Sequence, residues 1–146
     1  MAAITPVEQT DVVKPTEQGD WHNTLIRRTS GKGTDNQVDT LTHTPNGLER
    51  LVSVEVIYDA TPTYTGTGLT ITRDSDLGAD YDIPLNLGAE PANNARYYAW
   101  YPGDTDVNSI NGEVYLIGAD EVLVVALPAG GSGIGATCVI TTEQLG

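Results

Sequence analysis

Apolar and polar residues alternate along much of the chain, and the alternation is clearest between residues 48 and 58. Val52, Val54 and Val56 fall on one side of this segment, whereas Ser53 falls on the other. Successive side chains of a β-strand point to opposite faces, so a period of two indicates a strand with one face buried. We therefore expect a strand over residues 48–58.

Eight further segments are short, rich in apolar or β-branched residues, and bounded by turn residues such as Asn-Gly. The run VLVVALP at 122–128 is apolar on both faces, which is typical of a central strand that is covered on both sides. No helical periodicity persists over ten residues. The expected strands are 21–29, 37–44, 48–58, 69–74, 81–87, 96–101, 113–117, 121–127 and 136–142. Strands at this spacing predict an all-β fold, a single antiparallel β-sandwich with jelly-roll-like wiring.

The first twenty residues, MAAITPVEQTDVVKPTEQGD, lack this pattern and contain few large apolar side chains. Such a segment buries too little apolar surface to offset the entropy lost on ordering. We expect residues 1–20 to form an extended N-terminal arm that orders only against a neighbouring molecule, or else to remain an unordered tail. A chain of 146 residues is the size of one domain, so residues 21–146 are expected to form the β-sandwich domain.

The chain is acidic, with seven basic against twenty acidic side chains and a net charge of −13. Nucleic acids and anionic membranes bind clustered lysine and arginine, so neither is expected as a partner. No apolar run approaches the ~20 residues of a membrane span, and no export signal is visible, so synthesis in a cytoplasm is expected. The single cysteine, Cys138, lies in an expected strand and is expected to be buried.

The stretch GLTITRDSDLGADYDIPL, residues 68–85, places four aspartates within nine positions: Asp74, Asp76, Asp80 and Asp82. Calcium loops present alternating oxygens around a tight turn, but the glycine and glutamate of the EF-hand pattern are not at their positions here. We expect a solvated turn between two strands. A looser calcium site built from these aspartates is one alternative, and a carboxylate pair acting as acid and base is another.

Basic side chains gather in IRRTSGK, where Arg27, Arg28 and Lys32 stand close together. Two interpretations stay open: the cluster docks on an acidic partner surface through arginine contacts, or it is a solvated edge strand. Trp21, at the start of the same expected strand, is a further candidate for partner contact.

Aromatic residues gather in ARYYAWYP, residues 95–102, with Tyr98 and Trp100 on one face and Tyr97 and Tyr101 on the other. One face is expected to belong to the core. The other is expected to cover an interface or a ligand, because aromatic side chains are enriched at interfaces. Tyr98 and Trp100 are our candidates for partner contact.

The order of the segments is also informative. A leading strand with Trp21 is followed by LVSVEVIYDATPTYTGTGLTITRDSDLGADYDIPL, then by YYAWYP, and then by DEVLVVALPAGGSGIGATCVITTEQL. This order resembles that of the small β-sandwich proteins that decorate the heads of tailed bacteriophages. The resemblance covers roughly residues 21–146 and lies in strands and turns, not in invariant residues.

The resemblance implies a non-enzymatic virion protein, often a homotrimer, that is bound to the major capsid protein on the head surface. It carries over no catalytic residue, cofactor or metal. Two other functions remain open: a different virion component, such as a neck, tail or baseplate part, and a carbohydrate-binding module. The latter would use Tyr97, Tyr98, Trp100 and Tyr101 as a stacking platform.

Overall fold

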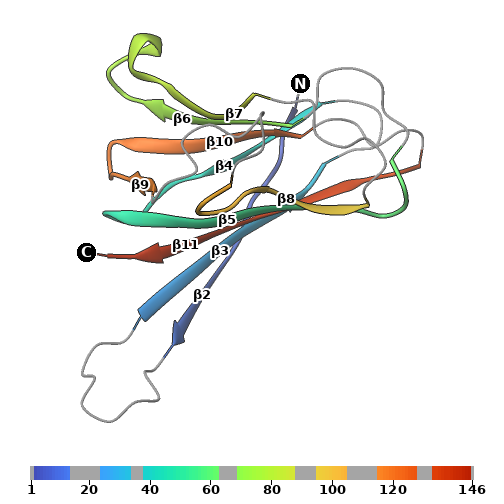
Figure 1. Cartoon of the computed structure of the whole chain (residues 1–146), viewed down its shortest axis with the longest axis horizontal. Coiled ribbons are helices and arrows are strands. Elements are labelled where there is room, and N and C mark those ends of the chain that lie inside the picture. The colour runs from blue at the N-terminus through green and yellow to red at the C-terminus, as the bar shows by residue number, and fades with distance from the viewer. Residues whose placement is uncertain are drawn as a thin grey trace.

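Two β-sheets pack face to face in the computed structural model of the chain (Figure 1). The structure describes residues 2–13, 24–33, 38–62, 69–87, 95–104, 115–127 and 133–145. The five-stranded sheet has the order β1 (Ala2–Ala3), β4 (Asp39–His43), β10 (Glu121–Leu127), β6 (Thr70–Ser75) and β7 (Ile83–Leu87). The six-stranded sheet has the order β2 (Val7–Val13), β3 (Thr24–Lys32), β11 (Ala136–Gln144), β5 (Glu49–Tyr58) and β8 (Arg96–Trp100), and β9 (Tyr115–Ile117) also pairs with β5.

The prediction of an all-β sandwich of antiparallel strands is confirmed. Among the described residues, every strand pair is antiparallel except β1 with β4. The nine expected strands correspond to β3 through β11, with ends that differ by a few residues. A jelly-roll wiring is not confirmed.

Apolar side chains from both sheets fill the space between them. The fully buried members include Leu41, Ile71 and Leu123 from the five-stranded sheet and Val54 and Trp100 from the six-stranded sheet. Such a continuous core accounts for most of the stability of a sandwich, because burying one such side chain stabilises the fold by about 1.5–3 kcal/mol. Cys138 on β11 is also buried, as expected, and its burial raises the pKa of the thiol.

A β-bulge interrupts β5 and changes which of its side chains face the core. Ser53 pairs with Thr141 of β11, and Leu51 pairs with Thr142, so β5 contains one extra residue, Val52, at this point. An extra residue reverses the alternation beyond it. Leu51 is therefore fully buried and Val52 is only half-buried, so the expectation that Val52 shares the buried face is wrong.

The N-terminal residues occupy the same edge of both sheets. β1 pairs with β4 in the five-stranded sheet, and β2 pairs with β3 in the six-stranded sheet. Between them, Ile4 packs against the core, and its backbone N–H donates to the carbonyl of Thr40 at 2.8 Å. The expectation of an arm set apart from the sandwich is not confirmed, because these residues pair with strands of their own chain. Residues 14–20 of the expected arm lie outside the described part.

Candidate functional site

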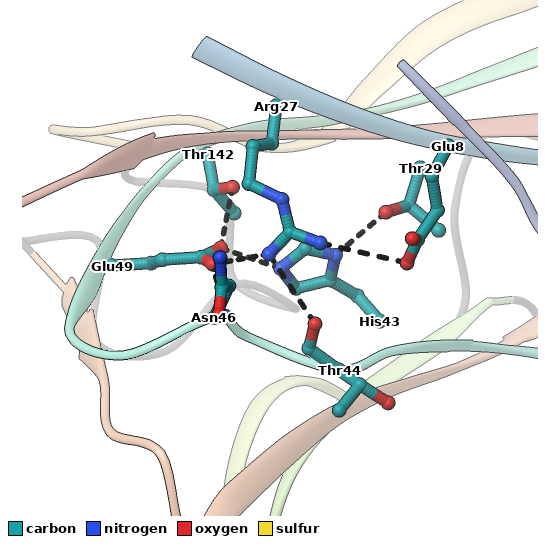
Figure 2. Close-up of polar contacts among 8 residues, drawn as sticks. All are labelled: Glu8, Arg27, Thr29, His43, Thr44, Asn46, Glu49 and Thr142. Carbon is teal, nitrogen blue, oxygen red and sulfur yellow. Dashed lines mark hydrogen bonds and ion pairs between the residues drawn. The ribbon is translucent and has the colours of Figure 1, made fainter. Parts of the chain in front are cut away.

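Strands from both sheets bring charged and hydroxyl side chains together at one point in the interior (Figure 2). β3 contributes Arg27 and Thr29, β4 contributes His43, the first residue of β5 is Glu49, and β11 contributes Thr142. Four of these side chains are fully buried, and Arg27 is 9% exposed. We call these five residues the buried network. Glu49 faces inward because of the bulge in β5.

Glu49 is the centre of the buried network. Its Oε1 accepts a hydrogen bond from the Thr142 hydroxyl at 2.7 Å and lies 2.7 Å from His43 Nε2. Its Oε2 accepts from Arg27 and from the backbone N–H of Asn46, the latter at 2.6 Å. Burial by itself raises the pKa of Glu49, but the hydrogen bonds from these four groups together lower that pKa to about 2. The side chain is therefore a carboxylate at neutral pH.

The buried network also contains a hydroxyl, an imidazole and a carboxylate in series. Thr29 Oγ1 lies 2.7 Å from His43 Nδ1, and the other ring nitrogen faces Glu49. Because a carboxylate only accepts, Nε2 donates to Glu49. This is the order of groups that activates a nucleophile in hydrolases. Here all three side chains are 0% exposed, so a substrate does not reach the Thr29 hydroxyl, and we assign the network a structural role.

The four aspartates singled out in the sequence lie around the connection between β6 and β7, which includes a short 3-10 helix, Ala79–Tyr81. Asp82 Oδ1 accepts a hydrogen bond from the backbone N–H of Ser75 at 2.9 Å. The charge of Asp82 raises the pKa of Asp74 more than any other influence.

A pocket of about 640 Å³ lies beside this connection and is lined in part by Asp76, Asp80, Asp82 and Asp120. Among the described residues, no three or more His, Cys, Asp or Glu side chains are placed so that they could hold a metal ion together. The calcium alternative therefore gains no support from the geometry.

The basic cluster expected to dock on a partner is split by the structure. Arg27 belongs to the buried network, whereas Arg28 and Lys32 are exposed on the surface and are ion-paired with Asp11 and Asp59. Each lysine or arginine in the described part of the chain has an acidic partner, the other pairs being Arg50–Glu143, Arg73–Glu121 and Arg96–Glu55. The positive charge of the cluster is thus compensated within the chain. Trp21 lies outside the described residues.

The aromatic segment divides between the core and the surface, but not by simple alternation. Trp100 is fully buried, so a partner that docks on the folded chain does not reach its ring. Tyr97 packs against the core beside Tyr58. Tyr98 and Tyr101 are 55% and 46% exposed, and their rings meet edge to face, with centroids 6.5 Å apart and planes at 76°. One face of a sugar ring cannot stack on both tyrosine rings at once, which weakens the carbohydrate-binding alternative.

β2, the strand at the end of the six-stranded sheet, is not predicted by the sequence pattern. Val7 and Val12 on this strand are 65% and 52% exposed. The segment VEQTDVV does contain β-branched residues, but its apolar positions do not alternate, because residues 7–10 are all exposed and neither face of this part of the strand is buried.

The described surfaces that present large apolar or aromatic side chains include the outer edge of β2, the pair Tyr98 and Tyr101, and Leu77 with Tyr81 on the β6–β7 connection. The described part of the chain contains no helix that is long and apolar enough to cross a membrane. Comparison with protein-family models, with curated proteins and with solved structures finds no match for this chain.

Proposed function

We propose that the chain is a non-enzymatic structural protein of a phage particle, which binds the outside of the capsid and decorates or stabilises it. The order of strands and turns along residues 21–146 supports the phage assignment by resemblance. The observation that carries the non-enzymatic part is the buried network: its hydroxyl, imidazole and carboxylate are sealed in the interior, where they join strands.

Tyr98 and Tyr101 supply the contact with the major capsid protein in this proposal. Both rings are about half exposed on β8 and the turn after it. A tyrosine ring offers a large apolar area at a low cost in side-chain entropy, and tyrosine is among the residues that contribute most to binding at interfaces. The pair also lies on the edge of the six-stranded sheet opposite β2, so a molecule bound there leaves β2 accessible.

Arg28 and Lys32 remain available as additional contacts. Their ion pairs with Asp11 and Asp59 are exposed, and exposed pairs contribute only about 0–1 kcal/mol. An acidic group on the capsid can therefore replace the internal partner at little cost. A homotrimer on the capsid, which the resemblance implies, is part of the same proposal.

The proposal is tested by counting copies in purified virus particles from the source, by quantitative mass spectrometry relative to the major capsid protein. Near-stoichiometric copies are expected. A few copies per particle would instead indicate a neck, tail or baseplate part, and complete absence would overturn the virion assignment.

The docking surface is tested separately on capsids that lack the protein. The double substitution Tyr98→Ser with Tyr101→Ser should lower capsid occupancy at least tenfold, because a buried aromatic anchor contributes about 2 kcal/mol or more. Tyr81→Ser is the matched control, since Tyr81 is 59% exposed on the β6–β7 connection, away from this surface. Equal occupancy for the double variant and the control would contradict the assignment of the surface.

A further inference from the structure

The outer edge of β2 is an unusual feature of the surface. Among the described strands, β2 pairs only with β3, so the backbone groups on its other side are available for pairing. Residues 7–10 and Val12 are exposed. Figure 1 shows the C-terminal end of β2 running away from the five-stranded sheet.

Native proteins usually block such edges with short strands, prolines, lysines or bulges. The other four edge strands in the described structure each carry one of these devices. β1 has two residues and β9 has three, β7 contains Pro84 and a register shift against β6, and β8 has a register shift against β5. β2 has seven residues without proline, lysine or glycine, and its register with β3 is unbroken. It is therefore the sheet end best suited to accept another strand.

The two acidic residues of β2 do not block its edge either. Asp11 is ion-paired with Arg28, which compensates its charge, and Glu8 lies 3.6 Å from Arg27, whose single charge also faces Glu49. A second strand that approaches β2 therefore meets one partly compensated carboxylate, that of Glu8.

We propose that this edge pairs with β2 of a second copy of the chain, antiparallel, about a two-fold axis at Thr10. A two-fold contact uses the same surface on both molecules, so the strand must be complementary to itself. With the axis at Thr10, residues 7 and 13, 8 and 12, and 9 and 11 lie opposite each other, and all seven residues of β2 are paired. The two six-stranded sheets then form one continuous sheet.

The charges of β2 favour this register. Asp11 lies opposite Gln9 of the second copy, and within one chain the Gln9 amide already donates to Asp11 at 3.1 Å. Glu8 lies opposite Val12. An axis at Asp11 would place two aspartates opposite each other, and an axis at Gln9 would pair only residues 7–11 of the strand. Like charges directly opposite are destabilising in antiparallel pairs.

The inference does not depend on the proposed function, because it concerns the isolated chain. A two-fold contact at β2 also differs from the three-fold contact that the resemblance implies, and one molecule can make both. The tests below use purified protein without capsids, so their failure would leave the copy-number experiment unaffected.

Light scattering after size exclusion tests the association. The chain should form species in even multiples of 15.5 kDa, and Thr10→Lys should halve the mass, because it places two ammonium groups opposite each other. Leu77→Lys is the control, because Leu77 is 76% exposed on the β6–β7 connection and the substitution adds the same charge away from β2. A wild-type chain that is monomeric at millimolar concentration, or a Thr10→Lys variant with wild-type mass, would overturn the proposal.

Cysteine cross-linking tests the register. Cβ atoms of opposite residues in an antiparallel pair are about 4.5–5.5 Å apart, close to the separation that a disulfide needs. Thr10→Cys should form a disulfide with itself. Glu8→Cys mixed with Val12→Cys should give a mixed dimer, although neither cross-links alone. The native Cys138 is buried, so it should not form cross-links in this experiment. Cross-linking of Thr10→Cys no greater than that of Leu77→Cys would contradict the register.

Discussion

Glu49 lies in the core because β5 contains one residue more than its partner strand. Without the bulge at Val52, the alternation that buries Val54 would turn Glu49 to the solvent. Once inside, the carboxylate needs partners, since an unpaired buried charge is strongly unfavourable. Arg27 and His43 are among the groups that supply them. The bulge and the buried network therefore depend on each other.

Replacing Glu49 by glutamine should cost on the order of 3–5 kcal/mol of unfolding free energy, because Arg27 loses its buried partner. Glu143→Gln is the matched control: it breaks the pair with Arg50, which is 42% exposed, and should cost about 1 kcal/mol or less. Urea unfolding at pH 7 measures both. Similar losses for the two variants would show that the buried network contributes no more than a surface pair.

Glu49 also makes the free energy of unfolding depend on pH. The folded-state pKa of Glu49 is lowered from 4.5 to about 2, so its contribution is fully present above about pH 4.5 and is lost as the pH falls toward 2. The wild-type free energy of unfolding should fall across that window, and Glu49→Gln should show a shallower decline. Parallel curves for the two proteins would contradict this assignment of the carboxylate.

At the scale of elements, the strands were predictable from the sequence because period-two alternation survives in most of them. Bulges were not, since they are decided by pairing between distant residues. Glu49 and Thr142 are hydrogen-bonded although they lie 93 positions apart in the sequence, and no sequence pattern near either residue predicts this contact. The burial of Trp100 could not be predicted from the sequence for the same reason. The register shift between β5 and β8 lets the adjacent residues Ala99 and Trp100 both be buried. The prediction from strict alternation, that the Trp100 ring contacts a partner, is therefore wrong.

One close side-chain contact adds to the strand pairing that attaches the N-terminal strands. A Cβ on Gly31 of β3 would lie 2.4 Å from Ile4 Cγ2, so Gly31→Ala should displace Ile4 and loosen β1 and β2. We expect a loss of about 1–3 kcal/mol and faster proteolysis within residues 2–13. Ser30→Ala on the same strand is the control and should cleave at the wild-type rate. Equal cleavage of both variants would mean that Ile4 does not hold the segment.

The acidic connection between β6 and β7 should behave as a solvated turn. Adding calcium, or a chelator, should leave the melting temperature unchanged, because a ligand that binds only the folded chain would raise it. Magnesium at the same ionic strength is the control for charge screening. A calcium-specific rise of several degrees would reinstate a metal site at Asp74, Asp76, Asp80 and Asp82.

At the scale of the whole molecule, most contacts join residues far apart in the sequence. β11 pairs with β3, which precedes it by about a hundred residues. Folding should therefore take milliseconds to seconds, as in other proteins dominated by distant pairings. Stopped-flow fluorescence measures it, in a Trp21→Phe variant where the buried Trp100 is the only tryptophan. A complete microsecond folding phase would contradict this expectation.

β11 lies between β3 and β5 in the six-stranded sheet, although both partners precede it in the sequence. A ribosome needs roughly 4–16 s to travel from the end of β5 to the start of β11 at ordinary synthesis rates. Through that interval the nascent chain displays the two strand edges, on β3 and β5, that β11 occupies in the folded chain. Neighbouring nascent chains on one messenger can donate that strand to each other, so a translational pause after residue 127 would favour intertwined products over single folded molecules.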